Sequence, residues 1–203
     1  MIIPDSIDRS AGWHEPPLCR RYLVVHFEAL PLLVKEGGPQ SDRTVYWALG
    51  AHAEGPCEVL GVWPTLPSGG QDWREVFESL AARGVERIRF VVSAAADAVP
   101  ATHMGATVLT LDSQQGSSGL APPGALSPRL RRIVKLAAME VSVMQAELVR
   151  LIRRHGAFPS TVAASDFLQK ALARMERRFW TGASARAASA RRQSIAVPRA
   201  AAV

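Results

Sequence analysis

The sequence contains few of the features that identify a membrane protein or a disulfide-rich protein. It has two cysteines in 203 residues, Cys19 and Cys57, which are far apart and in no metal-binding spacing. They predict a reduced, cytoplasmic protein with two incidental thiols. No run of about 18 apolar residues occurs, so no membrane-spanning helix is expected. The first residues lack a basic and an apolar stretch, so no signal peptide is predicted.

Three common catalytic motifs are also missing. No glycine-rich loop follows a strand and opens a helix; for the pair Gly69-Gly70 a plain turn is favoured over a phosphate-binding loop. No nucleophile elbow of the Gly-x-Ser-x-Gly type occurs. The five histidines are scattered without zinc-binding spacing: His14, His26, His52, His103 and His155. Carboxylates therefore remain as the main candidates for chemistry.

Charge is distributed unevenly along the chain. Residues 1–128 hold 9 Lys/Arg and 14 Asp/Glu, a net charge of −5, whereas residues 129–203 hold 15 Lys/Arg and 4 Asp/Glu, a net charge of +11. A basic half indicates a polyanionic partner such as nucleic acid. Arginine-rich surface helices and alanine/arginine tails also occur without such a partner, and charge alone does not separate the two interpretations.

Apolar runs and turn residues predict an α/β fold. The predicted strands are 22–27 with a continuation to 34, 44–50, 58–63 and 85–93, with a short one at 106–111. The first three form an antiparallel meander, because short Gly/Pro turns join them. Pro31 indicates an edge, a bulge or a break in the first strand, since proline cannot donate a ladder hydrogen bond. Helical spacing from Trp73 to Leu80 predicts a helix that stops at Gly84.

Two more helices are predicted after a segment with little structural signal. Pro128 opens the first, which Gly156 ends, and Ser160 or Thr161 caps the second, which runs to about Trp180. The predicted organisation is a disordered lead-in at 1–20, an α/β core at 21–111, a linker at 112–128, C-terminal helices at 129–180 and a disordered basic tail at 181–203.

Two carboxylates have positions of chemical interest. Glu28 directly follows an apolar strand, and Glu140 lies on a later helix. Clustered carboxylates from distant elements can hold two Mg²⁺ ions for phosphoryl transfer. A buried glutamate is costly unless it is paired or bound to a metal. The alternative is that Glu28 simply points to solvent.

Three segments carry a more specific spacing. The first is Phe27-Glu28-Ala29 followed by Lys35-Glu36-Gly37-Gly38. The second is Leu60-Gly61-Val62-Trp63, then Trp73 after ten residues, then Leu80 and Arg83-Gly84. The third combines Arg150, Arg153 and Arg154 with Gly156-Ala157-Phe158-Pro159 and Trp180. Together they cover roughly 20–100 and 129–180, and they resemble the mutator-type family of bacterial insertion-sequence transposases.

This resemblance implies a ribonuclease-H-like fold with an Asp-Asp-Glu triad that holds Mg²⁺. The first aspartate position is Glu28 here, and the second is Ala94, with Asp97 three residues further on. The glutamate position falls on Glu140 or, counted back from Gly156, on Ser142. Alanine cannot ligate a metal, so the resemblance implies a degenerate site in which Glu28 and Glu140 are the candidate catalytic and metal-binding residues.

The family also implies partners and a location. The expected partner is DNA at the ends of an insertion element, contacted by Arg150, Arg153 and Arg154, in the cytoplasm at the nucleoid and without a membrane. A homo-oligomer or a complex with an intact transposase is a further expectation. The short distance from Ala94 to Glu140 indicates an internally deleted member. The predicted function is a transposase-like protein with impaired strand cleavage and transfer, and the alternative is a non-catalytic DNA-binding remnant or regulator.

Overall fold

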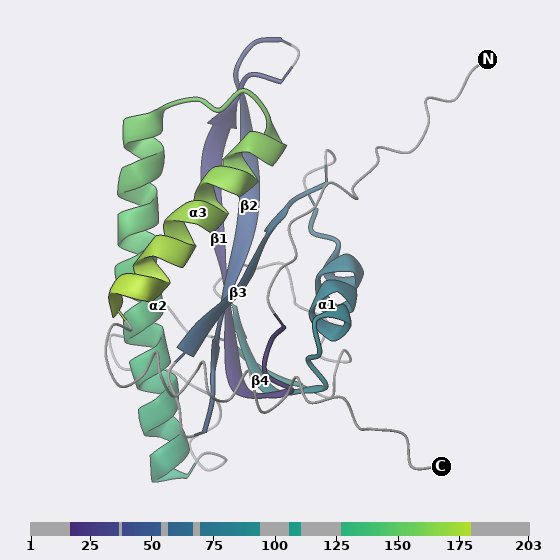
Figure 1. The fold of residues 1–203 in the computed structure, drawn as a ribbon, viewed down its shortest axis with the longest axis vertical. Coiled ribbons are helices and arrows are strands. Elements are labelled where there is room, and N and C mark those ends of the chain that lie inside the picture. The colour runs from purple at the N-terminus through teal and green to yellow at the C-terminus, as the bar shows by residue number, and fades with distance from the viewer. Residues whose placement is uncertain are drawn as a thin grey trace, which may run out of the picture.

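A computed structural model describes residues 17–36, 38–53, 57–66, 70–93, 106–110 and 127–179. The fold is α/β, as predicted: one mixed sheet has α1 on one face and α2 and α3 on the other (Figure 1). The elements in chain order are β1 (Arg21–Val34), β2 (Ser41–Ala51), β3 (Cys57–Pro64), α1 (Trp73–Ala82), β4 (Arg87–Ser93), β5 (Thr107–Thr110), α2 (Pro128–His155) and α3 (Thr161–Phe179).

The sheet has five strands in the order β3-β2-β1-β4-β5. The first three strands pair antiparallel, which confirms the predicted meander. The chain then crosses over through α1, and β4 pairs parallel to β1 on its other side, with β5 parallel to β4. This crossover makes β1 the middle strand of the sheet.

Pro31 lies in a strand that continues through it. It pairs with Thr44 of β2, while the pairing of β1 with β4 ends at Phe27. At Pro31, β1 therefore pairs with a strand on one side only. Proline has no N–H to donate, and on the other side there is no strand that would need it. Of the three predicted alternatives, an edge, a bulge or a break, the structure therefore shows a local edge at Pro31. A register shift of the bulge type occurs between β2 and β3, at Ala48 and Leu49.

The face under α1 has an aromatic core. Asp72 caps α1 by accepting a hydrogen bond from the Glu75 N–H, and Gly84 follows the helix with a φ of 98° that favours glycine. Phe27 of β1 lies against the rings of Trp63, Trp73 and Phe77, with centroid distances of 6.2, 5.1 and 6.0 Å. The helix is thus held on the sheet by contacts between rings from β1, β3 and α1 itself.

The opposite face packs against the two long helices and is mostly aliphatic. Ser127 caps α2 and Pro128 is its first residue, as predicted. Ser160, rather than Thr161, caps α3, because its hydroxyl accepts from the Ala163 N–H. The α2 residues that are buried recur at helical spacing: Leu130, Val134, Ala137, Val141, Met144, Leu148 and Ile152.

The turn between α2 and α3 is joined to the end of β1. Phe158 donates its N–H to the Leu33 carbonyl, and Lys35 donates to the Phe158 carbonyl, both at 2.8 Å. Gly156 reaches this turn with a φ of 77°. Buried Phe158 therefore extends the backbone pairing of β1 beyond the sheet and fixes the two helices over that strand.

Several predictions fall on residues whose structure is not described: most of the lead-in, the 112–126 part of the linker, and the basic tail. Within the described ranges, no helix combines the length and apolar character that a membrane crossing needs.

Candidate functional site

Glu28 lies on β1 and faces the side of the sheet that α2 and α3 cover. Val24 and Leu30, at the alternating positions on either side of it, belong to the core beneath these helices. Its register partner on β2 is Trp47, which is fully buried in the same core. The Glu28 side chain is half-buried, and this burial raises the pKa of its carboxyl group. Glu28 is therefore neither freely solvated nor sealed in the core.

Gln145 of α2 connects the helix to the strands beside Glu28. Its Oε1 accepts from the Trp47 indole N–H at 2.7 Å, and its Nε2 donates to the Ala29 carbonyl at 2.9 Å. Both groups are partly buried, so each would lose a partner if the amide were removed. These two bonds fix the height of α2 over the middle of β1.

His26 is the polar residue of this face that sequence reasoning missed. It precedes Glu28 by two residues on the same side of β1 and is only 1% exposed. Neither ring nitrogen has a hydrogen-bond partner among the described residues. Burial lowers the pKa of His26 to about 4, so the imidazole is neutral at pH 7. The available signal was a histidine in an otherwise apolar strand next to the candidate carboxylate.

The second predicted triad position follows β4. Ser93, the last residue of that strand, pairs with Phe27, the residue before Glu28. Ala94 and Asp97 lie outside the described residues. In this parallel pairing, β4 therefore ends beside the residue that precedes Glu28. The next residue in the sequence is Ala94, which has no carboxylate.

Glu140 and Ser142, the two candidates for the last triad position, are both exposed on α2. Burial raises the pKa of the Cys57 thiol, and the nearby Glu140 carboxylate raises it further. Cys57 begins β3, and β2 lies between β3 and β1. With about 4.8 Å between neighbouring strands, Glu140 is held about 10 Å to the side of β1. Ser142 bonds back to the Ala138 carbonyl of its own helix.

The structure thus does not bring Glu28 and Glu140 into one metal-binding group. Among the described residues, the three-residue cluster with metal-ligand geometry contains neither of them. Among the described residues, Glu28 therefore belongs to no group of three or more potential metal ligands, whereas an Mg²⁺ site needs near-octahedral oxygen ligands.

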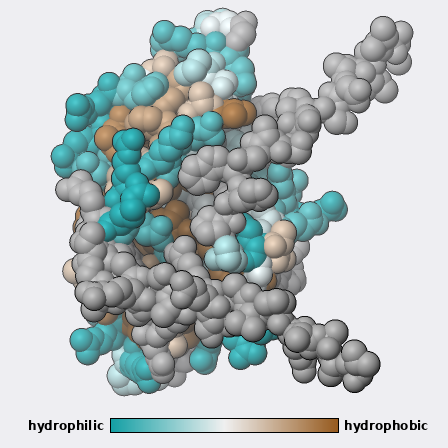
Figure 2. All heavy atoms as spheres, in the orientation of Figure 1, coloured by the Kyte–Doolittle hydropathy of each residue, from teal (hydrophilic) through white to brown (hydrophobic). Residues whose placement is uncertain are grey.

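The three arginines predicted to contact DNA lie near the end of α2 and are exposed. Arg150 pairs with Glu147 at 3.3 Å on the same helix. Arg153 and Arg154 lie in the last helical turn, where positive charge also interacts favourably with the helix dipole. Hydrophilic side chains cover much of the side of the molecule formed by α2 and α3 (Figure 2). This surface is available to a polyanion and also stable without one.

Comparison with known proteins gives consistent relatives. The chain is 31% identical over 91 residues to the transposase for insertion sequence element ISRM3 of Rhizobium meliloti, and equally similar to an ISRM3-like probable transposase of Sinorhizobium fredii. It is 35% identical over 72 residues to the transposase for insertion sequence element IS1081 of Mycobacterium tuberculosis. These alignments cover 44%, 44% and 36% of this chain and 23%, 23% and 17% of the relatives.

The family described as "Transposase, Mutator family" matches residues 2–112. This match includes all five strands and α1, and it ends before α2. The second of the three sequence segments that resemble the family runs from Leu60 to Gly84, and its residues contact one another on one face of the sheet. Trp63 donates its indole N–H to the Ser79 hydroxyl at 2.9 Å, and Arg83 donates to the Leu60 carbonyl. The resemblance carried by these residues is confirmed, and the chain belongs to the Mutator family of transposases.

Proposed function

We propose that this chain is a transposase-like protein whose sheet is the ribonuclease-H-like scaffold of a DNA strand-transfer site. The observation that carries the proposal is the position of Glu28. It lies on the middle strand of a sheet ordered β3-β2-β1-β4-β5, with β4 parallel to β1, and α2 crosses the same face. The last residue pair between these two parallel strands is Phe27 with Ser93, so Glu28 lies one residue beyond the point where β4 ends.

We propose further that strand cleavage is impaired in this chain. Removing an oxygen ligand from a metal site removes much of the charge stabilisation that phosphoryl transfer requires. Ala94 supplies no ligand, and the Glu140 carboxylate lies near Cys57 of β3. With Ala94 at the second position, Glu28 and its neighbours do not fit the two Mg²⁺ ions of the family's chemistry.

The second candidate function is binding of DNA without cleavage, including interference with an intact transposase at the ends of its element. The exposure of Arg153 and Arg154 at the end of α2 favours it, because cations there can contact phosphates. The chain spans less than a quarter of the length of the transposases of the ISRM3 type that it matches. Binding to element ends and assembly with another copy are therefore proposals for this chain.

A nicking assay tests the first proposal. Duplex DNA carrying insertion-element ends is incubated with the protein and Mg²⁺ or Mn²⁺, and wild type is compared with Glu28→Gln and with Glu78→Gln, an exposed glutamate of α1. We expect no cation-dependent nicking by wild type above the Glu28→Gln background. Nicking that is lost in Glu28→Gln and kept in Glu78→Gln would overturn the proposed impairment.

Salt-dependent DNA binding tests the second candidate. The double variant Arg153→Gln/Arg154→Gln should bind duplex DNA more weakly, and the slope of log affinity against log salt should flatten by about 1.8, since each phosphate contact contributes about 0.9. The matched control is Arg74→Gln/Arg87→Gln, which removes the same charge from exposed positions on α1 and β4. Equal losses in both double variants would contradict a binding surface at the end of α2.

A further inference from the structure

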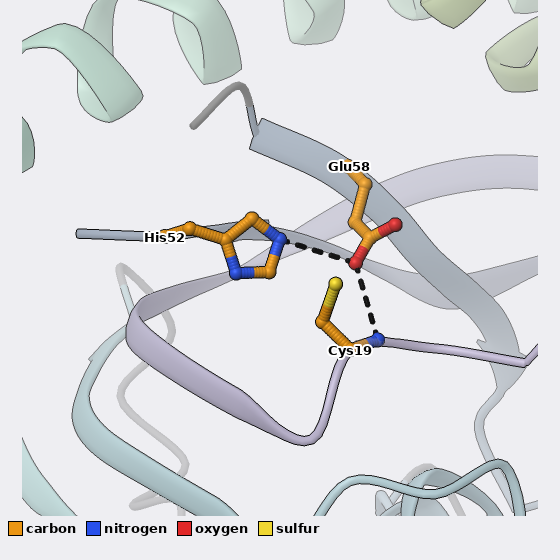
Figure 3. Close-up of side chains that lie close together, drawn as sticks. All are labelled: Cys19, His52 and Glu58. Carbon is orange, nitrogen blue, oxygen red and sulfur yellow. Dashed lines mark hydrogen bonds and ion pairs between the residues drawn. The ribbon is translucent and has the colours of Figure 1, made fainter. Parts of the chain in front are cut away.

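A second polar cluster lies at one end of the sheet, outside the site around Glu28. It consists of Cys19, just before β1, His52, just after β2, and Glu58, the second residue of β3 (Figure 3). One potential ligand atom from each residue lies within 4.8 Å of the others. Glu58 is buried, while Cys19 and His52 are half-buried, so a small ion can reach the cluster from solvent.

The antiparallel meander brings these three residues together. The start of β1, the end of β2 and the start of β3 meet at the same end of the sheet, and Gly50 pairs with Glu58. A Cβ at Gly50 would lie 2.5 Å from a ring carbon of Tyr22, so glycine lets that ring lie across β2. The Tyr22 hydroxyl then donates to the Glu58 carboxylate, and its ring lies 4.7 Å from that of His52.

The hydrogen bonds of His52 determine which ring nitrogen carries a proton. Its Nδ1 lies 3.2 Å from the Arg21 carbonyl, which can only accept, so Nδ1 is the donor. In the neutral ring, Nε2 then has a lone pair, and it lies 3.3 Å from Oε1 of Glu58. Two electron-pair donors facing each other repel unless a proton or a cation lies between them.

We propose that Cys19, His52 and Glu58 form a binding site for a zinc-like divalent cation. A thiolate, an imidazole and a carboxylate are the ligand types that Zn²⁺ prefers among proteins, and three of them leave a fourth position for water. Tetrahedral bonds of about 2.1 Å place neighbouring ligand atoms about 3.4 Å apart. The 3.3 Å between His52 and Glu58 already meets this spacing, and Cys19 Sγ, which lies within 4.8 Å of both, has to approach by at most about 1.4 Å.

The surroundings of the cluster support a metal site. Metal-bound histidines usually donate their other N–H to a carbonyl or carboxylate, and here the Arg21 carbonyl has that position. The Glu58 carboxylate likewise accepts from the Tyr22 hydroxyl and from the Cys19 N–H, the latter at 3.4 Å. An ion held here would join the segment before β1 to the ends of β2 and β3. This proposal does not depend on the proposed DNA chemistry.

Cobalt substitution tests the site directly. The metal-free full chain is titrated with Co²⁺, and thiolate-to-cobalt charge transfer together with tetrahedral d–d bands is recorded. The sequence has only two cysteines. We therefore expect the thiolate band to disappear in Cys19→Ser and to persist in the matched control Cys57→Ser.

Zinc affinity provides the second measurement. Competition titration with Zn²⁺ should give one equivalent per chain in wild type. Loss of a residue that only hydrogen-bonds to a metal ligand weakens metal binding by roughly 10–100-fold. His52→Gln removes a ligand itself, so it should weaken Zn²⁺ binding by at least that factor. Zn²⁺ should also raise the Tm of wild type more than that of His52→Gln. No cobalt band in wild type, or equal Zn²⁺ affinity in wild type and Cys19→Ser, would overturn the proposal and leave a protonated His52 paired with Glu58.

Discussion

The two faces of the sheet differ in what they contribute to the protein. The face under α1 carries the second of the three segments that resemble the family, and its residues pack through ring contacts and a bond to the backbone beside Phe27. The face under α2 and α3 carries the residues with possible chemistry, His26, Glu28 and, further to the side, Glu140. The segment with the two tryptophans therefore lies on the opposite side of the sheet from Glu28.

The two faces also differ in how closely packing constrains their residues. Gly61 shows the constraint on the α1 face: a Cβ there would lie 2.8 Å from the ring of Trp63, so packing fixes the residue type. On the other face, burial disfavours the charge of Glu28, and no hydrogen bond of its side chain is found among the described residues. Packing therefore constrains Gly61 more closely than it constrains Glu28.

The largest expected effect is at Trp73, and it tests this comparison most directly. Trp73→Ala removes a buried ring that contacts Phe27 and Tyr46, and it should lower the free energy of unfolding by about 3–5 kcal/mol. Glu28→Gln, measured by the same urea unfolding, should change it by less than about 1 kcal/mol. A larger loss in Glu28→Gln than in Trp73→Ala would break the comparison.

The next effect is the pH dependence caused by His26. Its pKa falls from 6.5 in the unfolded chain to about 4 in the folded one, so the unfolded state binds more protons between these values. Stability is fully present above pH 6.5 and is lost as the pH falls toward 4, by at most about 3 kcal/mol. His26→Leu should abolish this loss and keep or raise the stability at pH 7, since it removes two unpartnered nitrogens.

Glu28 gives the opposite sign and sharpens that test. Its pKa is raised in the folded state, so its contribution is present at low pH and is lost as the pH rises through the folded pKa. Glu28→Gln should therefore make the acid-side loss of stability steeper than in wild type. Urea unfolding at several pH values between 7 and 4 measures both slopes, and an unchanged slope in His26→Leu would contradict the assignment.

The last of these effects concerns Gln145, which joins α2 to the sheet. Gln145→Met keeps the length of the side chain but leaves the Trp47 indole N–H and the Ala29 carbonyl without their partner. The expected cost is about 1–3 kcal/mol in the free energy of unfolding. Ser142→Ala, on the exposed side of the same helix, should change it by less than about 0.5 kcal/mol. Equal costs would show that α2 is held by its apolar side chains alone.

Much of the fold could be predicted because local patterns decide it. Apolar runs and glycine turns located β1 to β4, and Pro128 and Gly156 located the two ends of α2. The edge character of Pro31 was also predicted correctly, although the pairing of β1 with β4 could not be read from composition. That pairing is set by the α1 crossover, which is a property of the whole chain.

The sites were harder to predict because they combine distant segments. The lateral position of Glu140 depends on a contact with Cys57 on β3, which helical spacing does not contain. Cys19, His52 and Glu58 lie at the ends of three different strands, so no local spacing in the sequence predicts their cluster. The prediction that the cysteines were incidental considered only their separation in sequence.

The backbone pairing of Phe158 with the end of β1 has a consequence for local unfolding. Leu33 and Lys35 cannot separate from their neighbour without also releasing the turn that joins α2 to α3. Sub-global openings follow such shared hydrogen bonds rather than sequence distance. We therefore expect the last residues of β1 and the start of α3 to unfold as one cooperative unit. Local unfolding of the two long helices would then be coupled to that of the strand that carries Glu28.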